Sequence, residues 1–88
     1  MATVYIPSLM QSLTGGQDKL EIAGSTVRQI VSNLEKAYPG FKERLVDGHR
    51  IKPNISVAVD GEVTPMGMLE KVGESSEVHF LPAIGGGG

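Results

Sequence analysis

The sequence contains no cysteine, no tryptophan and few other aromatic residues. Without cysteine there is no disulfide framework, no thiolate metal site and no cysteine nucleophile. Only two tyrosines and two phenylalanines are present. These are too few for the aromatic platform on which proteins stack single-stranded nucleic acid.

Charge of one sign is also not in excess, because eight Lys and Arg stand against ten Asp and Glu. No basic block occurs, so we expect neither nucleic acid nor an anionic membrane as partner. The first lysine is Lys19, which leaves the N-terminal segment without the basic region of a secretory signal. No apolar run approaches the length that spans a bilayer. We therefore expect a cytoplasmic protein.

A chain of 88 residues with an apolar fraction of 40% is expected to form one small globular domain. Residues 3–9 are predicted to form a strand with Val4 and Ile6 on one face. Residues 14–18 form a turn cluster, and residues 19–23 alternate again, so the two strands should make a hairpin with a long connection.

The clearest helix signal follows this hairpin. Thr26 and Gln29 have the spacing of a capping box. Pro39-Gly40 ends the helix, and residues 41–46 favour a further short helical turn before Asp47-Gly48. One apolar stripe runs along the helix, formed by Val27, Ile30, Val31, Leu34 and Tyr38.

The second half of the chain has the period of strands. Residues 49–54 are predicted to be a polar loop, and residues 55–59 a strand that turns through Asp60-Gly61 into a short strand at 62–63. Residues 64–73 show no period, although Met66, Met68, Leu69 and Val72 are available to cover a core edge. The last strand, residues 76–81, has Val78 and Phe80 inward and His79 and Leu81 on the other face. The pattern predicts an α+β fold, a mixed sheet of four to five strands with one main helix on one face.

One helix cannot cover both faces of that sheet. Tyr5, Pro7, Val63 and Leu81 fall on or beside the face opposite the inward residues. Scattered exposed apolar residues are normal, so they carry no function by themselves. If they cluster near the end of the last strand, they indicate a docking surface.

The chain ends in Gly85-Gly86-Gly87-Gly88, directly after the apolar residues of the last strand. We expect a folded domain over residues 1–84 and a flexible glycine tail over residues 85–88, because glycine adds nothing to a core and loses much entropy on ordering. The usable chemistry of such a tail is the α-carboxylate of Gly88. A segment without Cβ atoms is thin enough to enter a narrow slot on another protein.

These features resemble the ThiS/MoaD sulfur-carrier proteins of ubiquitin-like β-grasp fold, over nearly the whole chain. The resemblance is carried by the order of elements, by Val57-Ala58-Val59-Asp60-Gly61-Glu62 and by Glu77-Val78-His79-Phe80-Leu81-Pro82-Ala83-Ile84 before the glycines. Similarity to the branch that serves cysteine biosynthesis is carried by Ile6-Pro7, Thr14-Gly15-Gly16-Gln17, Leu34-Glu35, Tyr38, Glu43-Arg44-Leu45 and Asp47.

The resemblance implies a protein co-substrate rather than an enzyme. An E1-like adenylating enzyme would activate the terminal carboxylate with ATP, and a sulfur donor would convert it to a thiocarboxylate. The sulfur would pass to an acceptor enzyme such as a cysteine synthase, and a metalloprotease would release the product. No cofactor is expected to be bound permanently, since the ATP is used by the activating enzyme.

The resemblance also implies the site residues. Gly88 would bear the activated carboxylate, Gly87 would complete the terminal diglycine, and Gly85 and Gly86 would contact the partner. Leu81, Val63 and Pro7 would form the apolar contacts to partners. Members of the family commonly have one small residue before the two final glycines, whereas four glycines follow Ile84 here. Whether Gly87 or Gly88 is the functional terminus therefore stays open.

A C-terminal glycine tail is also compatible with other functions. The alternatives are the small subunit of molybdopterin synthase, a thiamine sulfur carrier, and a ubiquitin-like modifier that forms isopeptide bonds. A free-standing enzyme is disfavoured, because no nucleophile, metal set or phosphate loop is found. His49 and His79 have no second ligand at metal spacing, and we interpret both as surface or interface residues.

Overall fold

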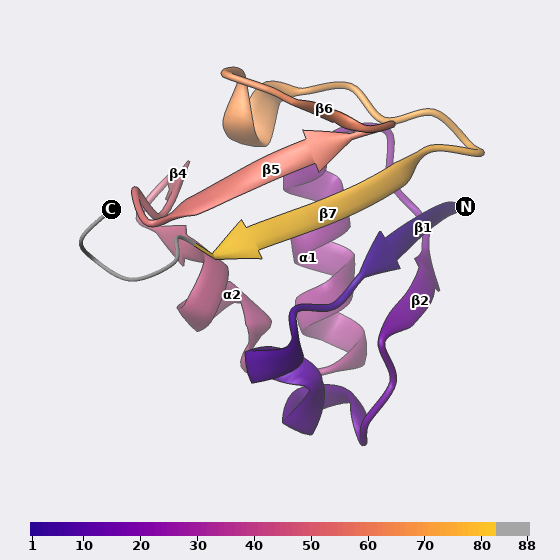
Figure 1. Ribbon diagram of the computed structural model, residues 1–88, viewed down its shortest axis with the longest axis vertical. Coiled ribbons are helices and arrows are strands. Elements are labelled where there is room, and N and C mark those ends of the chain that lie inside the picture. Colours follow the sequence, from indigo (N-terminus) through magenta and orange to yellow (C-terminus); the bar gives the residue numbers. More distant parts are fainter. Residues whose placement is uncertain (83–88) are drawn as a thin grey trace.

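The computed structural model describes residues 1–82, in which a five-stranded sheet lies against helix α1 (Figure 1). The strand order is β2-β1-β7-β5-β6. The central pair, β1 and β7, is parallel, and the other pairs are antiparallel, so the sheet is mixed. The α+β prediction is therefore confirmed. The elements are β1 (Ala2–Tyr5), β2 (Lys19–Ile22), α1 (Val27–Ala37), β5 (Ile55–Val59), β6 (Glu62–Val63) and β7 (Glu77–Pro82).

The first strand is shorter than the sequence predicts. It ends at Tyr5, and the 3₁₀ helix η1 (Ser8–Thr14) follows. Pro7 has no N–H for a ladder, and its carbonyl instead accepts from Met10 N at 2.8 Å, which starts the helical turn. The predicted strand over residues 3–9 is thus wrong from residue 6 onward, whereas the hairpin of β1 with β2 is confirmed.

The turn after η1 is tied to the end of α1. The buried Thr14 hydroxyl lies 2.7 Å from the carbonyl oxygen of Gln17, and Gln17 Nε2 donates to the Tyr38 hydroxyl at 3.1 Å. Tyr38 is the C-cap residue that directly follows α1. The Thr14 to Gln17 motif and Tyr38, which are part of the sequence resemblance, therefore contact each other in the fold.

The start of α1 has the predicted cap with one change. Thr26 Oγ1 accepts from Gln29 N at 3.2 Å, as a capping box requires. The return bond goes one residue further out, because Gln29 Oε1 accepts from Ser25 N at 2.8 Å. Both bonds satisfy N–H groups that have no partner within the helix.

A small hairpin follows the short helix α2 (Phe41–Leu45). The strands β3 (Val46–Asp47) and β4 (Arg50–Ile51) pair antiparallel around Gly48, whose φ is +69°. The predicted polar loop over residues 49–54 is wrong at β4. Two-residue strands are too short to show a period in the sequence.

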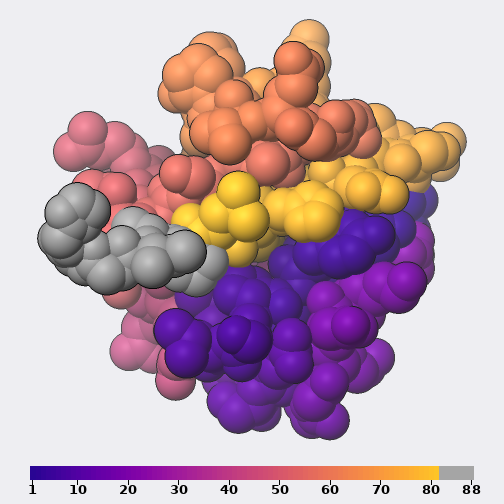
Figure 2. All heavy atoms as spheres, viewed as in Figure 1, coloured from indigo at the N-terminus to yellow at the C-terminus, as the bar shows by residue number. Residues whose placement is uncertain are grey.

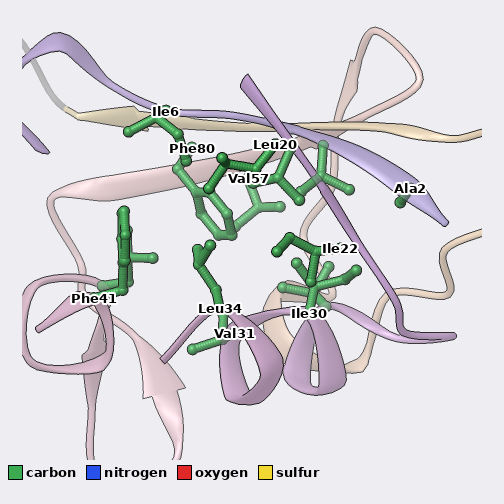
Figure 3. Close-up of a cluster of buried hydrophobic side chains, with 14 of the residues drawn as sticks. Ala2, Ile6, Leu20, Ile22, Ile30, Val31, Leu34, Phe41, Val57 and Phe80 are labelled. Carbon is green, nitrogen blue, oxygen red and sulfur yellow. The ribbon is translucent and has the colours of Figure 1, made fainter. Parts of the chain in front are cut away.

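The core lies between the sheet and the two helices (Figure 3). Phe80 and Val57 point from the sheet toward Leu34 and Val31 of α1, and Phe41 comes from α2. The predicted inward residues of β7 and the stripe of α1 are buried, except that Tyr38 is only partly buried, and this confirms the assignment of faces. Of the residues predicted to cover a core edge, Val72 is buried and Met68 packs against the core. Met66 and Leu69, on or beside the 3₁₀ helix η2 (Gly67–Leu69), are exposed instead.

Candidate docking face

The sheet face opposite α1 is turned toward the viewer in Figures 1 and 2, and no helix of the described part of the chain crosses it. We call it the open face. The strand register aligns one residue from each strand in a row across this face. The row is Lys19, Tyr5, His79, Ala58 and Val63.

Two stacked rings form the centre of the open face. The ring centroids of Tyr5 and His79 are 4.1 Å apart, and the ring planes differ by 6°. His79 Nε2 lies 3.8 Å from Glu77 Oε1. Ala58, next to His79 in the row, is 6% exposed although it is not part of the core cluster. The centre of the open face is therefore formed by the two stacked rings, beside an alanine that is almost fully covered.

The three predicted contact residues surround this centre. Leu81 lies two residues beyond His79 on β7 and is 43% exposed, and Val63 ends the row and is 61% exposed. Pro7, half-buried, follows Tyr5. Because β1 and β7 are parallel, Pro7 and Leu81 lie at the same end of these two strands. The structure thus gathers the apolar residues that the sequence could only place on one side.

Polar groups lie at the margin of the open face. On the β2 side, Thr3 Oγ1 donates to Glu21 Oε2 at 2.7 Å. Ser56 is exposed opposite Leu81, and Lys19 is exposed at the end of the row. An apolar centre with a polar margin is the usual composition of a protein–protein interface.

The sequence did not predict the ring stack or the position of Ala58. The alternation in β5 contains a usable signal, because Val57 inward places Ala58 outward. The stack has no such signal. Tyr5 and His79 are far apart in the sequence, and only the parallel register of β1 with β7 brings them together.

Asp60 has a structural role beside this face. Its φ of +52° fits the tight turn between β5 and β6. Oδ1 accepts from Glu77 N at 3.0 Å, and Oδ2 accepts from the Ser76 hydroxyl at 2.9 Å. The side chain therefore ties the start of β7 to the hairpin. This supports the interpretation of Asp60 as a turn residue.

The predicted sites Gly85, Gly86, Gly87 and Gly88 lie outside the described residues, as does the predicted boundary between residues 84 and 85. The described part of β7 ends at Pro82, which pairs with Ile55. Within residues 1–82, no three His, Asp or Glu side chains are placed to hold a metal ion. No helix in the same range is long and apolar enough to cross a membrane.

A mixed five-stranded sheet with a helix on one face and apolar groups on the other defines a small ubiquitin-like β-grasp protein. The chain belongs to the ThiS family, whose model matches residues 4–87. It is 31% identical to the sulfur carrier protein CysO of Mycobacterium tuberculosis strain H37Rv, over 97% of each chain.

Solved structures agree with this assignment. CysO in the Amycolatopsis orientalis BexX/CysO complex matches with a TM-score of 0.92 and 31% identity, over 97% of this chain and 98% of that one. Mycobacterium tuberculosis CysO matches with a TM-score of 0.88 and 30% identity, over 96% and 100%. The small archaeal modifier protein 1 of Methanosarcina acetivorans matches with a TM-score of 0.80 over 94% and 92%, but at 17% identity it shares the fold alone.

Proposed function

We propose that this protein is a sulfur carrier, a co-substrate whose C-terminal glycine carboxylate is converted to a thiocarboxylate. One observation carries the proposal most strongly. The ThiS family match extends from residue 4 to residue 87 and so includes Gly85, Gly86 and Gly87 as well as residues 4–82. The relatives at 31% identity are named sulfur carrier proteins.

The chemistry begins with an unreactive group. A carboxylate is a poor electrophile until one of its oxygens becomes a good leaving group. In the proposed cycle a carboxylate oxygen of Gly88 attacks the α-phosphorus of ATP on an E1-like enzyme, and pyrophosphate leaves. Sulfide from a donor then attacks the acyl carbon, and AMP leaves with the electron pair of the broken C–O bond. The product is a thiocarboxylate whose sulfur is a protein-bound nucleophile.

The open face would hold the carrier on its partners. Glycines offer a partner no side chains by which to orient them, so an apolar patch on the folded body lowers the entropic cost of placing the carboxylate. Leu81 and Pro7 lie near the C-terminal ends of β7 and β1. Val63 lies on β6, beside Ala58 in the row that contains the stacked rings. We propose these three side chains, with Gly85 and Gly86, as the contacts to the activating enzyme.

We propose cysteine biosynthesis as the destination of the sulfur, because the CysO relatives match at 30% identity or more over nearly the full chain. The thiocarboxylate sulfur would attack an activated serine derivative held by a cysteine synthase. An acyl shift would place the new cysteine in a peptide bond, and a metalloprotease would release it.

Intact mass spectrometry tests this proposal. The protein is incubated with the E1-like enzyme of its own organism, ATP and sulfide, and we expect a mass gain equal to the difference between sulfur and oxygen. Omission of ATP should abolish the gain. Addition of a cysteine synthase and its activated serine substrate should then yield the mass of the cysteinyl adduct. A chain that acquires no sulfur with the active enzyme would overturn the proposal.

A further inference from the structure

A hollow of about 660 Å³ lies on the other side of β5 from β7 and is separate from the stacked rings. The outward side of α1, the β3–β4 hairpin, the start of β5 and η2 form its walls. In Figure 1, β4 and η2 both lie along this side of β5, and the two are in contact. The volume is in the range of natural binding sites.

The lining of this hollow is cationic although the protein as a whole is slightly acidic. It contains four of the chain's eight Lys and Arg and no Asp or Glu. Within residues 1–82, none of the four lies within 4.0 Å of a carboxylate oxygen. The four cations are Arg28, Lys42, Arg50 and Lys52, and the lining also contains one histidine, His49. The charge of the lining therefore favours an anionic occupant.

Apolar side chains lie beside these cations. Met66 and Leu69 are 54% and 70% exposed and lie at the η2 wall. Ile51 packs against the core from the opposite wall, close to Gly67 of η2. Exposed methionine adapts to the shape of a bound chain, which suits a peptide surface. The occupant must therefore be aliphatic as well as anionic.

One wall of the hollow is a strand edge. β6 pairs only with Ala58 and Val59 of β5, and Thr64 N donates to Val57 O at 2.9 Å. The preceding residues of β5, Ile55 and Ser56, extend past this pairing and line the hollow. Ile55 N already donates to Lys52 O at 2.9 Å, and Ser56 pairs with Leu81 of β7, so side chains of the lining rather than the strand edge provide the contacts to an extended chain. A nucleotide is disfavoured, because the lining has no Phe, Tyr or Trp on which a base would stack.

We propose that this hollow, the basic groove, binds an extended acidic segment of a partner protein, in which carboxylates alternate with aliphatic side chains. The carboxylates contact Arg50, Lys52 and the neighbouring cations, and the aliphatic groups contact Met66 and Leu69. Ser56 lies at the border with the open face, but Tyr5, His79 and Leu81 are outside the groove. A protein held in the groove leaves these three residues accessible, so the carrier would engage two partners at once. This inference goes beyond sulfur transfer and stands without it.

An NMR titration of the full ¹⁵N-labelled chain tests the proposal. The probe is an acetylated and amidated hexapeptide of alternating glutamate and leucine. We expect the largest shifts at the backbone amides of β4, η2 and the first residues of β5. A glutamate–serine hexapeptide should bind several-fold more weakly, and a lysine–leucine hexapeptide should not bind. Affinity should fall several-fold in about 1 M salt, where the Debye length is about 3 Å.

Charge reversal separates the groove from net charge. Arg50→Glu with Lys52→Glu should lower the affinity about tenfold, since two contacts become repulsive. Lys19→Glu with Lys36→Glu changes the net charge equally on exposed residues outside the groove, and should leave the affinity within about twofold. Equal losses in the two double variants would overturn the proposal.

Three further results would overturn it. The first is no shift with the glutamate–leucine peptide at millimolar concentration, or shifts confined to the open face. The second is inorganic pyrophosphate moving the same amides as strongly as the peptide, which would define a site for small anions. The third is movement of groove amides when residues 85–88 are removed without any peptide, which would make the chain's own tail the occupant.

Discussion

The rings of Tyr5 and His79 stack across the parallel pair of β1 and β7, with centroids 4.1 Å apart and planes within 6°. The stack lies at the centre of the open face, between Lys19 on one side and Ala58 and Val63 on the other. The two side chains thereby form one element of defined shape. Such an element can be recognised at a lower entropic cost than two independent side chains.

The stack should also contribute to stability. In a double-mutant cycle with Tyr5→Ala and His79→Ala, we expect a coupling of about 0.5–1 kcal/mol in the free energy of unfolding. Urea denaturation followed by circular dichroism measures it. Strictly additive single and double variants would mean that the rings lie together without attraction.

Leu81→Glu should weaken docking on the activating enzyme more than it lowers stability. The substitution places a charge in the apolar part of the proposed interface, and we expect at least a tenfold loss of affinity, equal to about 1.4 kcal/mol. Calorimetric titration with the enzyme measures it. Leu69→Glu is the matched control, because Leu69 is also exposed but lies outside the open face. An unchanged affinity of the Leu81 variant would remove that residue from the interface.

Phe80 and Leu81 are neighbours in sequence with opposite expected effects on stability. Phe80 is 2% exposed and Leu81 is 43% exposed. Phe80→Ala should cost about 3–5 kcal/mol, as a large cavity in a core does. Leu81→Ala should cost less than about 1 kcal/mol. Thermal and urea unfolding compare the two variants, and similar losses would show that the assignment of faces in β7 is wrong.

Asp60→Ala should destabilise the turn between β5 and β6. The variant loses the acceptors of the Ser76 hydroxyl and of Glu77 N, and alanine is strained at a φ of +52°. We expect a loss of about 1–2 kcal/mol in unfolding free energy. Asp60→Asn keeps one acceptor oxygen and tolerates this φ, so it should lose clearly less. If Asp60→Asn were as stable as the unchanged protein and the loss in Asp60→Ala no larger than its backbone strain, the two carboxylate contacts would contribute nothing to stability.

Removal of Gly87 and Gly88 should abolish adenylation and leave the thermal unfolding midpoint unchanged. Within residues 1–82, the last residue of the core cluster is Phe80. Pyrophosphate release with the activating enzyme and ATP measures the first effect. Removal of Gly88 alone then identifies the functional terminus, since adenylation persists only if Gly87 can serve. Full adenylation of the variant that lacks both Gly87 and Gly88 would contradict the carrier proposal.

The assignment of faces could be predicted from the sequence because burial leaves a local period. The stripe of α1 and the alternation of β5 and β7 each record which side meets the core. The Asp60-Gly61 turn and the cap at Thr26 are also local, since a few adjacent residues determine them. These local signals, with the glycine run, were sufficient for the fold class and for the family resemblance.

Other features depend on contacts between distant residues. Strand β1 ends early because Pro7 bonds to Met10 rather than to a neighbouring strand, and β3 and β4 pair within segments that have no period. The sequence by itself therefore determined the main helix, most of the strands of the sheet, their inward faces and the terminal chemistry that is proposed. Only the tertiary structure decided the ring stack, the gathering of Pro7 with Leu81 and the basic groove. Strand register and helix docking set those distances, and neither leaves a local pattern in the chain.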